Sequence, residues 1–390
     1  MQIGKYQDLT PHGRMKKLES AQSSVAAKPV LNQHLLGDIR NLIDSARERA
    51  AQTVNANLVT LYWNVGNRIR REILKEKRAG YGEKIIPALS AQLAPEYGNG
   101  FNPRNLFHMI HFTEVFPNLE IVYALSSQLG WTHFRSIIPL KDPLQREFYA
   151  EMCRLERWST RTLGRKIQLM LFERTGLSRR PAELARQELK ALREKDKMTP
   201  DLVFRDPYIL DFLGLKDTYS EKDLETAILR ELERFILELG AGFTFVARQK
   251  RITVGNDDFY LDLLFYHRKL RRLVAIDLKL GKFQPVDKGQ MELYLRWLEK
   301  NDMESGDGIP LGLILCAGKS SEQVELLELE QSGIRVAEYL TELPPRELLK
   351  KKLHQAIQSA REQLNRKKQF IALDPGGNLK KSATFKKGTL

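Results

Sequence analysis

Two charged residues stand inside a segment that otherwise has the composition of a buried strand. In residues 271–283, RRLVAIDLKLGKF, Asp277 and Lys279 interrupt a run of apolar side chains. Strand side chains alternate between two faces, so Asp277 and Lys279 point to the same face. A buried charge is costly unless it is paired, hydrogen-bonded or bound to a metal ion. The segment therefore predicts a site that uses both charges.

A second acidic residue, Asp262, lies in the preceding strand-like segment, DFYLDLLFYHR. The polar stretch HRKLRR joins the two segments and predicts a hairpin. In a hairpin, Asp262, Asp277 and Lys279 can share one face of the sheet. Neighbouring carboxylates repel one another unless they are protonated or bridged by a cation, and Mg²⁺ is a suitable bridge. We therefore expect a divalent metal site here.

Two predicted helices carry polar residues that can join this site. In the helix expected over residues 220–240, Glu225 falls inside the arc of apolar side chains, where a carboxylate needs a partner. In the segment GQMELYLRWLEK, Gln290 and Tyr294 are one helical turn apart and share a face. Each feature also has a simpler explanation: a surface Asp–Lys pair, a Glu–Arg pair, or a core tyrosine. Their joint order along the chain favours an active site.

The spacing of apolar residues divides the chain into two folded regions. Residues 31–176 have mostly helical periodicity, with Gly and Pro between the helices. Residues 205–345 predict the order α-β-β-β-α-β-α-β, which implies an α/β domain with a mixed sheet flanked by helices. The other segments are interpreted as a flexible N-terminus (1–30), a charged linker (177–204), a basic helix (346–372) and a disordered basic tail (373–390).

One helix of the first region has the pattern of a recognition helix. In NPRNLFHMIHFTEVF, Asn102 is a suitable N-cap and Pro103 a suitable first helical residue. As the second helix of a helix-turn-helix, this segment would present Arg104, Asn105 and His108 to DNA. Many helical hairpins that never touch nucleic acid share the same pattern, so both interpretations remain open.

Composition narrows the class of protein and of partner. No apolar run in the 390 residues approaches the length of a membrane span, and the first residues lack a signal-peptide core, so we expect a cytoplasmic protein without a membrane partner. Cys153 and Cys316 are far apart and are expected to be core residues.

The net charge of +14 favours a polyanionic partner. Residues 341–390 alone carry +8, either as a solubilising tail or as a clamp on phosphates.

The run of motifs from DPYILDFLGL to LGLILC, with LVAIDLKLGKF and GQMELYL inside it, resembles the YhcG-type branch of the PD-(D/E)XK nuclease superfamily. The stretches LYWNVGNRI, GFNPRNLFHMIHF and LSSQLGWTHF are similar to the helical, winged-helix-like domain that precedes the nuclease domain in that family. The resemblance covers about residues 30–345 and implies a restriction-endonuclease-like core of order αβββαβ. Leu261 stands where the motif has proline.

The resemblance also implies roles for the residues already singled out. Asp262, Asp277 and Lys279 take the motif positions, Glu225 matches the common acid of the first helix, and Gln290 with Tyr294 matches the QxxxY element. The expected metal ligands of Mg²⁺, or of Mn²⁺ in its place, are Glu225, Asp262, Asp277 and the carbonyl of Leu278. Lys279 would orient the attacking water or stabilise the negatively charged phosphorane, and Gln290 and Tyr294 would position the strand. Phosphate contacts are expected from Arg248, Lys250 and Arg251.

We therefore expect a Mg²⁺-dependent nuclease that hydrolyses phosphodiester bonds in nucleic acid, with DNA the expected substrate. The main alternative is a nucleic-acid-binding or assembly protein whose nuclease-like domain is inactive. A hydrolase of small phosphoesters is a third possibility, but it would leave the basic tail and the accessory domain unexplained. The sequence leaves open the choice between DNA and RNA, the preferred nucleic-acid structure, and the oligomeric state, a homo-oligomer included.

Overall fold

The structure, a computed structural model, describes residues 33–75, 81–215 and 218–373. Among these, the residues up to Ala51 form one compact unit and those from Gln52 onward form a second. The predicted N-terminal segment 1–30 lies outside the described residues, as does the predicted tail beyond Leu373. No helix in the described ranges is long and apolar enough to cross a membrane.

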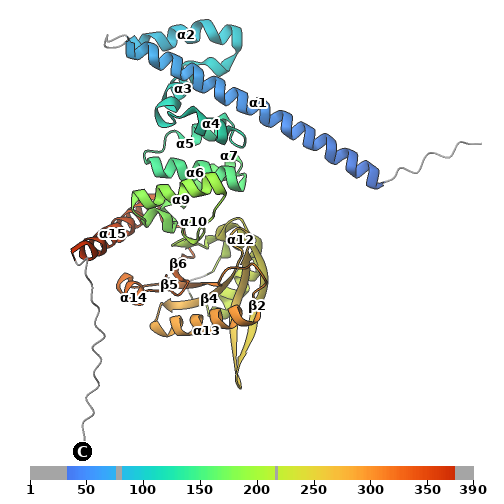
Figure 1. Cartoon of the computed structure of the whole chain (residues 1–390), viewed down its shortest axis with the longest axis vertical. Coiled ribbons are helices and arrows are strands. Elements are labelled where there is room, and N and C mark those ends of the chain that lie inside the picture. The colour runs from blue at the N-terminus through green and yellow to red at the C-terminus, as the bar shows by residue number, and fades with distance from the viewer. Residues whose placement is uncertain (1–32, 76–80, 216–217, 374–390) are drawn as a thin grey trace, which may run out of the picture. The chain divides into compact units, whose positions relative to one another are not determined.

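Helices and short turns make up the described chain before the sheet, as predicted (Figure 1). The elements are α1 (Gln33–Lys75), α2 (Tyr81–Tyr97), η1 (Asn99–Phe101), α3 (Pro103–Val115), α4 (Leu119–Ser126), α5 (Trp131–Ile137), α6 (Pro143–Glu156), α7 (Thr160–Gln168), α8 (Leu171–Arg174), η2 (Gly176–Arg179), α9 (Ala182–Lys195) and α10 (Pro200–Val203). No strand pair occurs in the described part of residues 33–174, so the winged-helix likeness lacks a wing there.

The core of this helical region is aromatic. The Phe112 ring lies 5.4 Å from that of Trp131 and 4.7 Å from that of Phe134, between centroids. Gly66 of α1 lies so close to α3 that a Cβ atom there would be 2.0 Å from the carbonyl oxygen of Met109. Only glycine permits this approach, which lets α1 pack directly on the α3 backbone.

The segment expected to be a charged linker is packed against the helical region. Its helix α9 buries Leu189 and Leu192. Arg193 of α9 also pairs with the fully buried Glu151 of α6, at 2.5 Å between Nε and Oε1. The high charge of this segment therefore serves in part to make ion pairs with the helix beneath it.

A six-stranded mixed sheet follows, in the order β1-β6-β5-β4-β3-β2. Its strands are β1 (Tyr208–Ile209), β2 (Phe243–Val254), β3 (Asp257–His267), β4 (Arg272–Lys282), β5 (Leu311–Gly318) and β6 (Ile334–Leu340). β2, β3 and β4 are antiparallel neighbours, whereas β4, β5, β6 and β1 run parallel. The helices of this region are η3 (Asp211–Leu213), α11 (Glu221–Arg230), α12 (Leu232–Leu239), α13 (Pro285–Asn301), α14 (Ser321–Leu326) and α15 (Arg346–Leu373).

The predicted α/β order is confirmed, with differences in detail. Strand β1 was not predicted, because its two residues gain strand geometry only by pairing with β6. The single helix expected over residues 220–240 is wrong: it is interrupted at Glu231, which has φ −106° and ψ 31°. The Glu231 carboxylate pairs with Arg234 at 3.3 Å at this break. A capping box formed by Ser220 and Asp223 starts α11.

Apolar side chains cover both faces of the sheet. On one face, Ile276 and Leu278 of β4 belong to the same buried cluster as Leu224 of α11. On the other face, Ala275 of β4 shares a cluster with Met291 of α13, and Figure 1 shows α13 beside β4. β4 is therefore buried on both faces, as the apolar density of its sequence predicts. Cys153 and Cys316 are both buried and unpaired, which confirms them as core residues.

A buried ionic cluster joins the last helices of the helical region to the sheet. Arg174 of α8 is 1% exposed and its Nη1 lies 2.5 Å from Oε1 of Glu238 on α12. Arg205 approaches the other carboxylate oxygen of Glu238 at 3.3 Å. Burial alone would raise the pKa of Glu238, but Arg174 and Arg205 outweigh it and hold that pKa below its usual range. The three charges thus stabilise one another where water is excluded.

We predict that Glu238→Gln lowers the free energy of unfolding by about 3–5 kcal/mol, because it leaves two buried arginines without a counter-charge. Urea unfolding followed by circular dichroism measures the loss. Glu231→Gln is the matched control: its carboxylate pairs with an exposed arginine on the same helix pair, and the change should cost at most about 1 kcal/mol. Equal losses for the two variants would contradict this role of the cluster.

Candidate active site

The hairpin of β3 and β4 opens where the predicted acids begin. The backbone pairing of the two strands ends at Leu263 and Ile276, and the next residues on each strand are Asp262 and Asp277. Beyond that point the backbone N–H of Leu278 donates to Oδ2 of Asp262 at 2.8 Å. The Asp262 carboxylate thus replaces a backbone acceptor, and the two strands separate around it.

Gln249, opposite Asp262 on β2, links that carboxylate to Glu225 of α11. Its Nε2 lies 2.9 Å from Oε2 of Glu225 and 3.0 Å from Oδ1 of Asp262. The two carboxylate oxygens therefore lie around one amide nitrogen. Gln249 has φ +44° inside a strand, a conformation that is costly for a residue with a side chain and that concentrates at functional sites. This contact is consistent with the expectation that Glu225 lies on the core-facing side of its helix and can join the site.

Asp277 and Lys279 form an ion pair on β4, at 2.9 Å between Oδ2 and Nζ. Lys279 Nζ also lies 3.4 Å from Oε1 of Gln290 on α13. Gln290 Nε2 donates to the hydroxyl of Tyr294 at 2.6 Å, and that hydroxyl donates to the carbonyl of Tyr260 at 3.1 Å. The structure therefore brings the Asp-x-Lys pair and the Gln-x-x-x-Tyr pair together in one hydrogen-bonded chain.

Asp277 and Lys279 share one face of the sheet, as predicted, and that Asp262 shares it with them stays a prediction. Alternation along β4 places Asp277 and Lys279 on the α13 face, opposite to Ile276 and Leu278. Glu225 reaches the site from α11 on the other face. Asp262 connects the two groups because the gap between β3 and β4 lets its carboxylate lie at the sheet itself.

Burial sets the proton affinities of the three acids. It raises the pKa of Asp277 to about 6; Lys279 opposes the shift, and Asp262 and Asp287 add to it. Burial also raises the pKa of Asp262 and of Glu225. Burial lowers the proton affinity of Lys279, but Asp277 more than compensates and raises that pKa above its usual value. At neutral pH the site holds closely spaced acids with one ammonium group among them.

These residues fit a hard divalent ion. Oδ2 of Asp277 is buried, and Lys279 Nζ lies 2.9 Å from it as its ionic partner. In the described ranges no group of three His, Cys, Asp or Glu side chains forms a ready-made metal cage. Mg²⁺ needs no such cage, since it is commonly held by one or two carboxylates with waters and substrate phosphates. The carbonyl of Leu278 as a further ligand stays a prediction.

The three basic residues predicted on β2 differ in their surroundings. Arg248 is exposed and forms no ion pair with any acid of the described residues. Lys250 pairs with Asp302 at 2.7 Å, and Arg251 pairs with Asp258 at 2.6 Å. Arg248 is therefore the one whose charge is available to a phosphate without breaking an ion pair.

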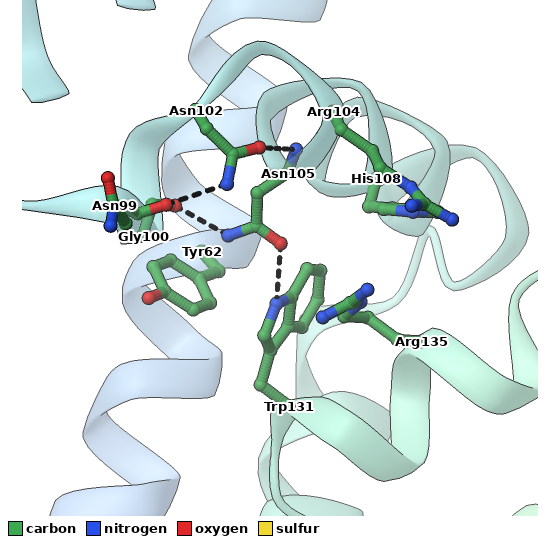
Figure 2. A pocket seen from close by; sticks show the side chains of 9 residues that line it. All are labelled: Tyr62, Asn99, Gly100, Asn102, Arg104, Asn105, His108, Trp131 and Arg135. Atoms are coloured by element: carbon green, nitrogen blue, oxygen red, sulfur yellow. Dashed lines mark hydrogen bonds between the residues drawn. The ribbon is translucent and has the colours of Figure 1, made fainter.

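The helix predicted to read DNA begins as expected, with Asn102 capping it and Pro103 as its first residue. Arg104 is exposed and His108 half-buried. Asn105, however, is 8% exposed and its amide is already in use, donating to the Gly100 carbonyl at 2.5 Å and accepting from the Trp131 indole at 2.8 Å (Figure 2). The expectation that Asn105 contacts nucleic acid is wrong, because its side chain holds α3 to its neighbours.

Comparison with known proteins matches both regions. Residues 38–174 match the family described as DUF1016 N-terminal domain, and residues 201–354 match the YhcG PDDEXK nuclease domain. The chain is 34% identical over 344 residues to "Putative nuclease YhcG" of Escherichia coli (strain K12), covering 80% of this chain and 91% of that protein. The chain belongs to the YhcG family. This confirms the resemblance drawn from the sequence motifs.

Two solved structures are each similar to about a third of this chain. A repair endonuclease from Pyrococcus abyssi is 23% identical with a TM-score of 0.24, and the match covers 33% of this chain and 50% of that chain. The EndoMS-dsDNA2 complex is 19% identical with a TM-score of 0.24, covering 33% of this chain and 49% of that chain. The chain thus spans about half the length of these proteins.

All the acids, the lysine and the Gln–Tyr pair of the site lie within the YhcG PDDEXK nuclease domain. Sequence reasoning missed two of its residues. Gln249 lacks a spacing signal, because its contact with Glu225 and Asp262 depends on strand pairing and a positive φ. Glu221, at the start of α11, accepts the backbone N–H of Leu280 at 3.3 Å. Acids are common at helix N-termini, so the position of Glu221 in the sequence carries no specific signal for the site.

In this YhcG-family domain the ionised form of Asp277 should destabilise the metal-free protein. Its pKa is raised from 3.8 to about 6 by folding, so this group makes the folded state less stable as the pH rises through 6. We predict that Asp277→Asn, measured by urea unfolding in EDTA at neutral pH, increases the free energy of unfolding by about 1–3 kcal/mol. The increase should shrink as the pH falls toward 4, where Asp277 is neutral in the wild-type chain.

Asp258→Asn on the neighbouring part of β3 is the control for that experiment. The pKa of Asp258 is lowered by hydrogen bonds from Arg251 and Thr253, so its ionised form is favoured by folding and its removal should not stabilise. Stabilisation of both variants, or of neither, would show that burial of the Asp277 charge is not the cause.

Proposed function

We propose that the protein is a divalent-metal-dependent nuclease that hydrolyses phosphodiester bonds in DNA. The observation that supports it most is the opening between β3 and β4, where Asp262 accepts a backbone N–H and the buried Asp277 carboxylate has Lys279 as its cationic partner. Buried carboxylates that repel one another are found mainly at functional sites, where a bound group compensates their charge. The match of residues 201–354 to the YhcG PDDEXK nuclease domain supports the proposal that a cation does so here.

Asp262 and Asp277, with Glu225 on the α11 side, would hold Mg²⁺ or Mn²⁺ through carboxylate oxygens, the donors that these hard ions prefer. When bound, such an ion polarises the phosphodiester and lowers the pKa of the attacking water. In the metal-free protein, Nε2 of Gln249 lies 2.9 Å from Oε2 of Glu225 and 3.0 Å from Oδ1 of Asp262 and holds both oxygens in place. Its amide thus limits their repulsion before the cation arrives.

Lys279 is the cationic group of the site and keeps its proton at neutral pH, since Asp277 raises its pKa. Its side chain is 22% exposed, so the ammonium group can reach a bound phosphate or the attacking water. A donor fixed at the point where negative charge develops lowers the barrier more than the same donor in water would. Lys279 therefore orients the nucleophile or stabilises the charge that develops on the phosphate oxygens.

Gln290 and Tyr294 act through Lys279. Tyr294 is 1% exposed, and its hydroxyl is occupied by Gln290 and by the Tyr260 carbonyl. Gln290 in turn lies against the Lys279 ammonium. We therefore assign these two as positioning residues, in place of the earlier expectation that they position the nucleic-acid strand themselves. Arg248, exposed beside the Glu225–Gln249 pair, is the proposed phosphate contact.

The proposal is tested by incubating the protein with labelled single-stranded, duplex and branched DNA, and with matched RNA, in Mg²⁺, Mn²⁺ or EDTA. We expect cleavage of DNA that requires the divalent ion. Asp277→Asn should abolish cleavage and weaken metal binding together, because a charged oxygen ligand is lost. Binding of DNA that is equal in Mg²⁺ and EDTA, with no cleavage of any substrate, would instead support a binding or assembly protein with an inactive domain.

Lys279→Ala should fail differently from Asp277→Asn. It removes no oxygen ligand, so we expect metal affinity measured by calorimetry to remain, while single-turnover cleavage slows about 10²- to 10³-fold. Lys300→Ala, an exposed lysine at the end of α13, is the control and should cleave at the wild-type rate. Full activity in the Lys279→Ala variant would remove Lys279 from the mechanism.

A further inference from the structure

A pocket in the helical region lies apart from the proposed active-site residues. It is a cavity of about 210 Å³ at the start of α3, with walls from α1, η1 and α5. Figure 2 shows the side chains that line it: Tyr62, Asn99, Gly100, Asn102, Arg104, Asn105, His108, Trp131 and Arg135. None of these residues belongs to the nuclease domain match.

One side of the pocket carries positive charge without a counter-charge. Arg104 and Arg135 are exposed, and neither forms an ion pair with an acid in the part of the chain that the structure describes. Figure 2 shows His108 beside Arg104, with Arg135 facing them from α5. Burial, then Arg135, Arg104 and His111, lower the pKa of His108. The positive potential that these groups share is what an anion would relieve.

The rest of the pocket is a built polar frame. Asn105 is more than nine-tenths buried and bridges the Gly100 carbonyl to the Trp131 indole, at 2.5 and 2.8 Å. Asn102 donates to the carbonyl of Asn99 at 2.8 Å and accepts the N–H of Asn105 at 2.9 Å. Trp131 packs edge-on against Tyr62, with 5.0 Å between ring centroids. The cavity is therefore present before a ligand arrives, and the two arginines that line it are exposed.

We propose that this pocket binds the terminal phosphate of a nucleic-acid strand, an inference that rests on the proposed nuclease function for the nature of the ligand. Two arginine charges suit a terminal phosphate, which carries nearly two negative charges, better than an internal phosphodiester, which carries one. His108 beside them can donate a further hydrogen bond. Arginine also binds phosphate oxygens through paired N–H groups. The cavity is smaller than the roughly 300–1,000 Å³ of sites that enclose a whole ligand, so it suits an end group whose strand continues outside.

The test uses the full-length protein in EDTA, so that no strand is cut. Fluorescence anisotropy measures the affinity for one internally labelled single strand with a 5′-phosphate, with a 3′-phosphate, or with neither. We expect one phosphorylated form to bind about 10-fold tighter or more than the unphosphorylated strand. Arg104→Gln with Arg135→Gln should remove this preference. Arg161→Gln with Arg186→Gln, which takes the same charge from exposed helix positions outside the pocket, should retain it.

Equal affinity for the three strands, or a preference that survives in the Arg104→Gln/Arg135→Gln variant, would overturn the proposal. So would a mononucleotide that competes as tightly as the phosphorylated strand, because the ligand would then be a free nucleotide. Thermal unfolding checks that the variant is folded, and Arg104→Lys with Arg135→Lys, which keeps the charge but loses the paired donors, should show an intermediate preference. End preference without metal-dependent cleavage would refute the nuclease proposal alone, and cleavage without end preference would refute the pocket alone.

Discussion

The separation of β3 from β4 is the feature on which the rest of the site depends. A backbone N–H in a sheet must find an acceptor, and at Leu278 that acceptor is the side chain of Asp262 instead of the opposite strand. The substitution satisfies the backbone while opening the sheet, and it fixes a carboxylate between its two faces. Helix α11 can then supply Glu225 from one face while α13 supports Lys279 from the other. A continuous ladder would keep these groups apart.

Repulsion among the acids explains the raised pKa of Asp277 and the position of the Gln249 amide. Asp277 is buried beside Asp262, and only Lys279 opposes the resulting rise in its pKa to about 6. Gln249 adopts a strained backbone conformation to place one amide between Glu225 and Asp262. Strain and uncompensated charge are costs that folding elsewhere must offset, and the extensively buried sheet and the ion pairs of Glu238 supply that stability. The repulsion is thus only partly compensated within the protein, which supports the proposal that a cation binds here.

In the pocket of the helical region, unlike in the acidic site, the buried polar groups pair with one another. Asn105 and Trp131 satisfy each other in the interior, so the frame is complete without a ligand. The unsatisfied groups are the charges of Arg104 and Arg135 at its edge, which water can solvate until an anion binds. A basic chain of net charge +14 therefore has, in its structure, specific places where that charge is free and others, such as Lys250 and Arg251, where it is already paired.

Local pattern alone determined most of the fold and the membership of the acidic site. Alternation along β4 placed Asp277 with Lys279, and helical periodicity aimed Glu225 at the core, because both depend only on the geometry of a single element. Tertiary structure decided what lies between elements. The opening at Asp262, the contacts of Gln249 and the burial of Asn105 all depend on how strands and helices pack together. The alternation of side chains along one strand does not show where its hydrogen bonding to the neighbouring strand ends. The sequence by itself therefore determined which residues could do chemistry, and only the packing of the two faces around the interrupted β3–β4 pairing decided which of them lie together and which support the fold.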